Sequence, residues 1–182
     1  MLMHLSFERL AVVVLIGLLS LNTHAQNSKA HRARAHRAAR PARIILFVCE
    51  HGAAKSVIAA AYFDVLARKR GLNYKAVFRG TNPEKSLAPS AEKGLREDGI
   101  STNGWKPEVV TQENMKEASQ IVTLGCVLPG ADAQETKIAK WDEIPSVSDD
   151  YHVARDEIKR RVQSLVDDLA RKESKRRKRP GH

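Results

Sequence analysis

One short segment constrains the fold more than any other: the run RIILFVC at residues 43–49 and the residues that follow it. The run is continuously apolar and of strand length, which is typical of a strand buried on both faces of a parallel sheet. The turn Glu50-His51-Gly52 then leads into apolar residues at helical spacing, which predict a helix from about Ala53 to Arg70, ended by Gly71. A buried strand followed directly by a helix predicts an α/β fold.

The alternation of strands and helices continues along the chain. Apolar runs predict further strands, and Pro89 and Thr111 stand where helices begin. Strands that alternate with helices imply parallel βαβ units. We expect strands at Tyr74–Gly80, Gln120–Leu124 and Lys137–Trp141, and helices at Ser90–Asp98, Thr111–Ala118 and Val153–Leu169.

Both ends of the chain carry segments of unusual composition. Residues 1–25 combine a short polar start, an apolar stretch and a small residue at Ala25, so they are expected to be a secretory signal peptide cleaved after Ala25. The alternative is an uncleaved N-terminal anchor, although the stretch is short for a bilayer span. Residues 26–42 are expected to be a disordered basic linker and residues 173–182 a disordered basic tail, with the domain at 43–172. The domain is therefore expected to be exported, periplasmic or secreted, where cysteines meet oxidising conditions.

The net charge of +10 suggests a polyanionic partner, but its distribution argues against one for the domain. Residues 26–43 hold six Lys/Arg and no acid, and residues 171–182 hold seven Lys/Arg and one acid. Between them, residues 44–170 hold 17 Lys/Arg against 19 Asp/Glu. No specific nucleic-acid binding is expected, and only the basic ends are expected to touch polyanions.

Cys49 stands at the carboxyl end of the first strand, where open α/β sheets bind ligands. The next helix directs its N-terminus at the same place, and its free N–H groups favour an anion. Gly52 can adopt a left-handed turn, Lys55 adds a positive charge and the Ser56 hydroxyl can donate to a thiolate. This cysteine loop, residues 49–56, is predicted to bind an oxyanion around a nucleophilic thiolate, with these residues in contact with phosphate: Glu50, His51, Gly52, Ala53, Ala54, Lys55 and Ser56. The alternative is a buried cysteine beside an ordinary glycine turn.

The cysteine loop resembles the signature of the low-molecular-weight tyrosine phosphatase and arsenate reductase superfamily, a strand followed by Cys-x5-Arg-Ser and a helix. Cys49 falls on the nucleophile of that signature and Ser56 on its serine. Weaker similarity extends over about residues 43–170 and includes the helix at Pro89–Ile100 and the strand at Gln120–Cys126. The resemblance implies a three-layer α/β sandwich with a four-stranded parallel sheet and the phosphate-binding loop after the first strand.

The resemblance also implies a general acid. Residues 148–151 resemble the family's Asp-Pro-Tyr stretch, so Asp149 takes the place of the aspartate that protonates the leaving oxygen and then activates water. Asp150 and Asp142 are alternatives. Lys55 departs from the family by replacing the loop arginine with a flexible point charge, so oxyanion binding is expected to survive better than catalysis. Glu50 opposes thiolate formation if its side chain points inward.

The second cysteine, Cys126, follows a strand and should emerge at the same sheet edge as Cys49. It resembles the resolving cysteine of thioredoxin-coupled arsenate reductases, although the further cysteine of those enzymes is missing. Cys126 could resolve Cys49, form a static disulfide with it, or be a buried thiol without a redox role. The seven histidines are scattered without ligand spacing, so no metal and no cofactor is expected.

Three functions follow as hypotheses. The leading one is a cysteine-dependent phosphatase that hydrolyses phosphotyrosine or a small aryl phosphate through a phosphocysteine at Cys49. The second is an arsenate reductase-like enzyme that uses Cys49 and Cys126 and needs a thiol reductant. The third is a catalytically weak or inactive oxyanion-binding module. The pocket walls that would select the substrate are expected around Thr81–Ala88 and Gly130–Ala139.

Overall fold

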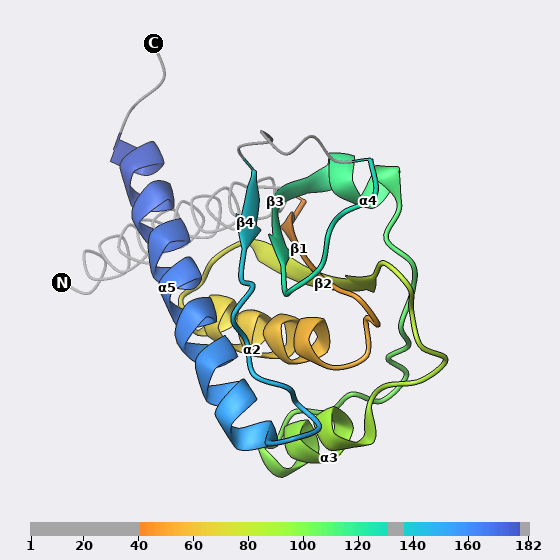
Figure 1. The fold of residues 1–182 in the computed structure, drawn as a ribbon. Coiled ribbons are helices and arrows are strands. Elements are labelled where there is room, and N and C mark those ends of the chain that lie inside the picture. Colours follow the sequence, from red (N-terminus) through yellow and green to blue (C-terminus); the bar gives the residue numbers. More distant parts are fainter. Residues whose placement is uncertain (1–40, 131–136, 179–182) are drawn as a thin grey trace, which may run out of the picture. The chain divides into compact units, whose positions relative to one another are not determined.

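The computed structural model describes residues 41–130 and 137–178, and the predicted α/β fold is confirmed (Figure 1). The first apolar run forms the central strand β1, which pairs with β2 on one side and β3 on the other. All four strands are parallel, in the order β2-β1-β3-β4. The elements are β1 (Arg43–Cys49), α2 (Lys55–Lys69), β2 (Tyr74–Gly80), α3 (Pro89–Glu97), α4 (Gln112–Glu117), β3 (Ala118–Thr123), β4 (Ile138–Lys140) and α5 (Tyr151–Lys178).

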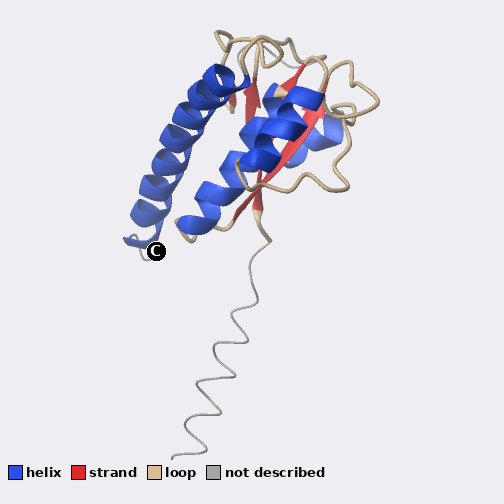
Figure 2. Cartoon of the chain, turned by 90° about the horizontal axis from the view of Figure 1, so that it is seen from below, coloured by secondary structure: helices blue, strands red, loops and turns tan. Residues whose placement is uncertain are grey.

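The two faces of β1 enter two different hydrophobic cores, because successive strand side chains point to opposite faces. Ile45 and Phe47 pack under α2 and α5, which cover one face of the sheet (Figures 1 and 2). Leu46 and Val48 pack on the other face against the short helix α4 and its flanking loops. The sheet therefore lies between two helical layers, as the predicted three-layer sandwich requires.

The larger core holds helix α2 firmly against β1. Phe47 and Phe63 are fully buried, with ring centroids 5.8 Å apart. Burial of such a side chain contributes roughly 1.5 to 3 kcal/mol. Residues Ser56–Phe63 of α2 are all buried, so the first half of this helix, which follows the cysteine loop, is fixed against the sheet.

Helix α4 is short, and its N-terminus depends on a cap. Thr111 accepts a hydrogen bond from the Asn114 amide, and the Asn114 side chain accepts one from the Thr111 amide. This capping box satisfies backbone donors that a short helix would otherwise leave unpaired. The predicted Thr111 cap is confirmed.

Helix α5 is longer than predicted, and the expected disordered tail at 173–182 is wrong for residues 173–178. Glu173 accepts hydrogen bonds from Arg43 and Tyr74, so it attaches this part of the helix to the first two strands. Arg176 also pairs with Glu173 one helical turn away. The charged residues at the end of α5 have good helix propensity and partners in the strands, so they extend the helix although they bury no apolar side chain there.

The expected signal peptide and residues 26–40 of the expected basic linker lie outside the described residues, as do residues 179–182. Within the described ranges, no helix is long and apolar enough to cross a membrane.

Candidate active site

Cys49 is the last residue of β1, and its side chain is almost completely buried, with 6% of its surface exposed. The Sγ atom lies 3.1 Å from Oγ of Ser56, in the first turn of α2. Either atom can be the donor in the neutral pair, whereas a thiolate can only accept from the hydroxyl. The structure therefore places Ser56 where the sequence required it, beside the candidate nucleophile.

The backbone of the cysteine loop is oriented by the segment that follows β2. The carbonyl oxygens of residues 49, 50, 51 and 53 accept hydrogen bonds of 2.8–3.1 Å from the amides of residues 81, 82, 84 and 88. Every described peptide bond is trans, so the N–H that shares a peptide plane with each carbonyl points the opposite way. The N–H groups of residues 50, 51, 52 and 54 consequently face away from the 81–88 segment.

These N–H groups are free to bind a ligand. Within residues 41–130 and 137–178, none of the amides of residues 50–54 has a hydrogen-bond partner. Helix α2 begins immediately afterwards at Lys55, without a side-chain cap, and adds the positive end of its dipole. Several free donors converging with a helix N-terminus form a site for an oxyanion.

Gly52 adopts the left-handed conformation that the sequence predicted, with φ of +59°. It lies against Gly80, the last residue of β2, so closely that a Cβ on either glycine would be 2.8 Å from the amide nitrogen of the other. Only two glycines allow this approach. Because β1 and β2 are adjacent parallel strands, Gly80 at the end of β2 packs directly against the backbone of the cysteine loop.

A cavity of about 530 Å³ opens over the cysteine loop. Its lining comes from four segments, one after each strand, that share the carboxyl edge of the sheet. The lining residues are Cys49–His51, Ala53–Lys55, Glu84, Ser86–Ser90, Leu124, Gly125 and Ser146–Ser148. The predicted wall at Thr81–Ala88 is thus present, whereas the predicted wall at Gly130–Ala139 lies partly outside the described residues, and its described part does not line the cavity.

Lys55 lines the cavity, but its amine is already engaged. Nζ donates a 2.8 Å hydrogen bond to the carbonyl oxygen of Ile144, in the segment that leads to the 146–148 wall. A lysine held in this way positions a wall and contributes charge, but it does not present the bidentate donor pair of an arginine. No local sequence pattern indicates the contact with Ile144, since it joins residues far apart in the chain.

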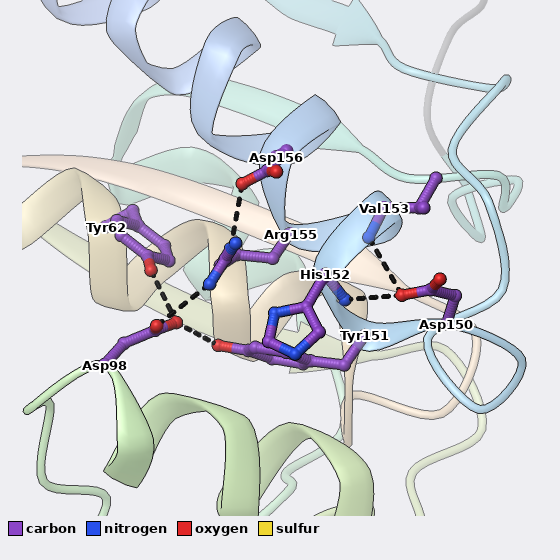
Figure 3. Close-up of polar contacts among 8 residues, drawn as sticks. All are labelled: Tyr62, Asp98, Asp150, Tyr151, His152, Val153, Arg155 and Asp156. Carbon is purple, nitrogen blue, oxygen red and sulfur yellow. Dashed lines mark hydrogen bonds and ion pairs between the residues drawn. The ribbon is translucent and has the colours of Figure 1, made fainter.

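The three aspartates considered as general acid are not equivalent in the structure. Asp150 caps α5, because its Oδ1 accepts hydrogen bonds from the amides of His152 and Val153 (Figure 3). Asp149 and Asp142 are exposed, and neither lines the cavity. Asp149 follows directly after the lining residues 146–148, so it remains the nearest of the three in sequence to the cavity wall.

The carboxylates that do line the cavity are Glu50 and Glu84. Both side chains flank His51, with its ring nitrogens 3.9 Å from Glu50 and 3.8 Å from Glu84. Glu84 was not singled out from the sequence. The pairing of β2 beside β1 places the loop after β2 at the same sheet edge, and this arrangement is not visible in the local sequence.

A cluster around Asp98, at the end of α3, includes Tyr151, the first residue of α5 (Figure 3). Asp98 Oδ2 accepts hydrogen bonds from the hydroxyls of Tyr62 (2.7 Å) and Tyr151 (2.6 Å), and Oδ1 accepts one from Arg155 (2.9 Å). The Tyr151 ring lies on Gly94 of α3, where a Cβ would be only 2.3 Å from the ring. The start of α5, and with it the end of the 146–148 wall, is thereby attached to α2 and α3.

The Asp98 cluster stabilises the ionised carboxylate. Burial raises the pKa of Asp98. Hydrogen bonds from Tyr151 and Tyr62 and the charge of Arg155 lower it by more than burial raises it, so the pKa of Asp98 lies below its usual value. Burial, followed by the hydrogen bond to Asp98, raises the pKa of both tyrosines. Asp98 therefore stays charged and both hydroxyls stay protonated over the physiological pH range.

Cys126 emerges beside Cys49, as expected. Its thiol donates to the carbonyl oxygen of Val48 over 3.4 Å, and that oxygen also accepts from the Leu124 amide. Both cysteines are free thiols, so the static disulfide is not formed in this structure. Burial raises the pKa of Cys126 to about 11, and the adjacent Cys49 contributes in the same direction. A thiol with this pKa is mostly protonated at neutral pH, which makes it a slow attacking nucleophile.

In the part of the chain that the structure describes, no group of three His, Cys, Asp or Glu side chains could hold a metal ion. The candidate site consists of a buried thiol, a hydroxyl donor beside it and several free backbone N–H groups. Such a site can bind a tetrahedral oxyanion while sulfur attacks its central atom.

Comparison with known proteins agrees with this geometry. Residues 44–137 match the family model of low molecular weight phosphotyrosine protein phosphatases. A Halobacterium salinarum protein named as a candidate arsenate reductase is 23% identical over 128 residues, which cover 68% of this chain and 90% of that protein.

Solved structures show the same fold. The arsenate reductase of Archaeoglobus fulgidus is 28% identical, with a TM-score of 0.57 over 67% of this chain and 98% of that one. A low molecular weight protein tyrosine phosphatase from Bacillus subtilis is 22% identical, with a TM-score of 0.58 over 70% of this chain and 97% of that one. The chain therefore belongs to the low molecular weight phosphotyrosine protein phosphatase family, whose fold is shared by arsenate reductases.

Proposed function

We propose that this protein is a phosphatase that hydrolyses phosphate monoesters through Cys49. The observation that carries the proposal is the buried Cys49 thiol, 3.1 Å from the Ser56 hydroxyl and at the edge of a loop with free amides at residues 50–54. Aryl phosphates, including phosphotyrosine, are the substrates expected from the sequence resemblance and are the natural first substrates to test.

The reaction takes place in two steps. The Cys49 thiolate attacks phosphorus, an S–P bond forms and the P–O bond to the leaving group breaks, while a carboxylic acid donates its proton to the leaving oxygen. The resulting carboxylate then takes a proton from water, which attacks phosphorus of the phosphocysteine; the S–P bond breaks, and inorganic phosphate leaves with the thiolate and the carboxylic acid restored. The loop N–H groups stabilise the three equatorial oxygens in both steps. Asp149 is the proposed acid, because Asp150 is occupied as the cap of α5.

The test is turnover of an aryl phosphate by the full chain under reducing conditions. We expect Cys49→Ser to abolish turnover, while Cys126→Ala, which removes the neighbouring thiol, keeps most of it. Absence of turnover in the reduced wild-type protein, with phosphate binding intact, would reject the phosphatase and leave the oxyanion-binding module.

Arsenate reduction is the second candidate, because the Cys126 thiol donates to the carbonyl oxygen of Val48, the residue before Cys49, and Cys49 contributes to raising the pKa of Cys126. In that reaction Cys126 would attack arsenylated Cys49, the S–As bond would break, arsenic would leave reduced and a Cys49–Cys126 disulfide would form. A thiol reductant would then restore both thiols. The raised pKa of Cys126 makes this step slow at neutral pH. Arsenate-dependent loss of both free thiols that disappears in Cys126→Ala would favour this candidate over the phosphatase.

A further inference from the structure

Among the described residues, no Phe, Tyr or Trp side chain lines the cavity. Each of the eight described aromatic residues has other partners, in the pairs Phe47–Phe63, Phe47–Trp141, Phe78–Trp105, Tyr62–Asp98, Tyr151–Asp98 and Tyr74–Glu173. An aryl group on a bound phosphate would therefore find no Phe, Tyr or Trp ring to stack on, the contact that gives aromatic ligands much of their specific affinity. The one ring in the lining is the imidazole of His51, which lies between two carboxylates.

The charged side chains around the cavity are also unusual for a site that binds a dianion. Glu50 and Glu84 are 63% and 59% exposed and flank His51, all three lining the cavity above the loop amides. The one lysine of the lining, Lys55, donates to the Ile144 carbonyl. Positive potential therefore comes mainly from the backbone at the floor, and negative potential comes from carboxylates nearer to solvent.

This arrangement separates two kinds of ligand. A phosphate monoester with a neutral or anionic substituent experiences repulsion from both carboxylates as it enters. A monoester whose substituent carries a cation gains attraction at the same place, while its phosphoryl oxygens still bind the loop amides. The cavity, at about 530 Å³, has room for both parts of such a small ligand.

We propose that the cavity selects small, non-aromatic phosphate monoesters that carry an ammonium group near the phosphoryl group, with Glu50 and Glu84 as the residues that bind the cation. This proposal rests on the proposed phosphatase function, because it assigns the substrate class of the same site. Glu50 and Glu84 are specificity residues in this scheme, and they take no part in the attack by Cys49.

Calorimetry on the full-length Cys49→Ser variant tests the proposal without depending on turnover. The probes are O-phosphoethanolamine and propyl phosphate, which have similar size and differ by the ammonium charge. We expect O-phosphoethanolamine to bind roughly tenfold more tightly at low ionic strength, and the difference to shrink at high salt because the carboxylates are exposed. Combining Cys49→Ser with Glu50→Gln and Glu84→Gln should bring the two affinities together.

A matched control combines Cys49→Ser with Glu113→Gln and Glu117→Gln, which remove the same charge from α4 on the other face of the sheet. This control should keep the preference for O-phosphoethanolamine. Equal affinity for the two probes, or a preference that the control removes as well, would overturn the proposal. If both probes bind with the expected preference but the wild-type protein turns over neither them nor an aryl phosphate, the substrate class stands as a ligand class and the phosphatase function fails.

Discussion

Gly52 and Gly80 lie backbone against backbone, and a Cβ on Gly52 would be only 2.8 Å from the Gly80 nitrogen. This contact joins the cysteine loop to the end of β2, the strand that precedes the 81–88 wall. Amides of the 81–88 wall donate hydrogen bonds to the carbonyl oxygens of the cysteine loop and thereby orient them. The proposed oxyanion site therefore depends on two glycines that are 28 positions apart in the sequence.

Gly52→Ala should destabilise the protein by about 2 to 4 kcal/mol, from the left-handed conformation and the clash together. Gly71→Ala is the matched control: its φ is +62°, and a Cβ there would have no atom within 4 Å. It should lose only about 1 to 2 kcal/mol. Urea unfolding of both variants measures the difference, and equal losses would show that the contact with Gly80 is unimportant.

Ser56→Ala should slow turnover roughly ten- to hundredfold, because a hydrogen bond to a charged acceptor is worth about 1.5 to 3 kcal/mol. The hydroxyl lies 3.1 Å from Cys49 Sγ and is fully buried. Steady-state kinetics with an aryl phosphate provides the measurement. Ser164→Ala, on the exposed side of α5, is the control and should leave kcat unchanged. A Ser56→Ala variant as fast as wild type would remove Ser56 from the mechanism.

Lys55→Met should weaken phosphate binding by about tenfold and also loosen the 146–148 wall, since it removes the cation and the hydrogen bond to Ile144. Lys55→Arg keeps the charge and is expected to retain binding. Calorimetry with inorganic phosphate compares the two variants. Unchanged affinity in Lys55→Met would mean that the loop amides alone hold the anion.

Asp98→Asn should lower stability by about 2 to 3 kcal/mol, because it leaves Arg155 without its partly buried partner and disturbs two tyrosine hydrogen bonds. Asp156→Asn removes the exposed partner of the same arginine and should cost under about 0.5 kcal/mol. Thermal unfolding of the two variants gives the comparison. If Asp98 also positions the 146–148 wall, KM for an aryl phosphate should rise in Asp98→Asn but not in Asp156→Asn.

Stability should fall in acid over a defined range of pH. Hydrogen bonds from Arg160 and Arg161 lower the pKa of Glu157 from 4.5 to about 2, and the Asp98 pKa is lowered as well. A carboxyl with a lowered pKa in the folded state binds its proton more readily when unfolded, so its contribution is complete above pH 4.5 and is lost as the pH falls toward 2. Urea midpoints measured from pH 6 to pH 2 should decline, and Glu157→Gln should reduce the decline.

The sequence alone determined the elements and the reactive loop. The apolar run at 43–49 is typical of a buried strand, and the structure confirms that strand. The residues from Cys49 to Ser56 were predictable because a loop between a strand and a helix N-terminus brings its own donors to one place. The Thr111 cap and the Gly52 turn were readable for the same reason. Boundaries were less secure: α5 continues to Lys178, since Glu173 has partners on β1 and β2 that no local pattern reveals.

Only the tertiary structure decided what surrounds the loop. The parallel order β2-β1-β3-β4 places the segments after all four strands at one edge, and this brought Glu84, the Ile144 carbonyl and the 146–148 wall to the cavity. The tertiary structure also made Asp150 the cap of α5, partly buried Cys126 and left every described Phe, Tyr and Trp out of the cavity lining. These outcomes depend on contacts between residues far apart in the chain, and the free energy of such contacts is set by packing, which the local sequence does not specify.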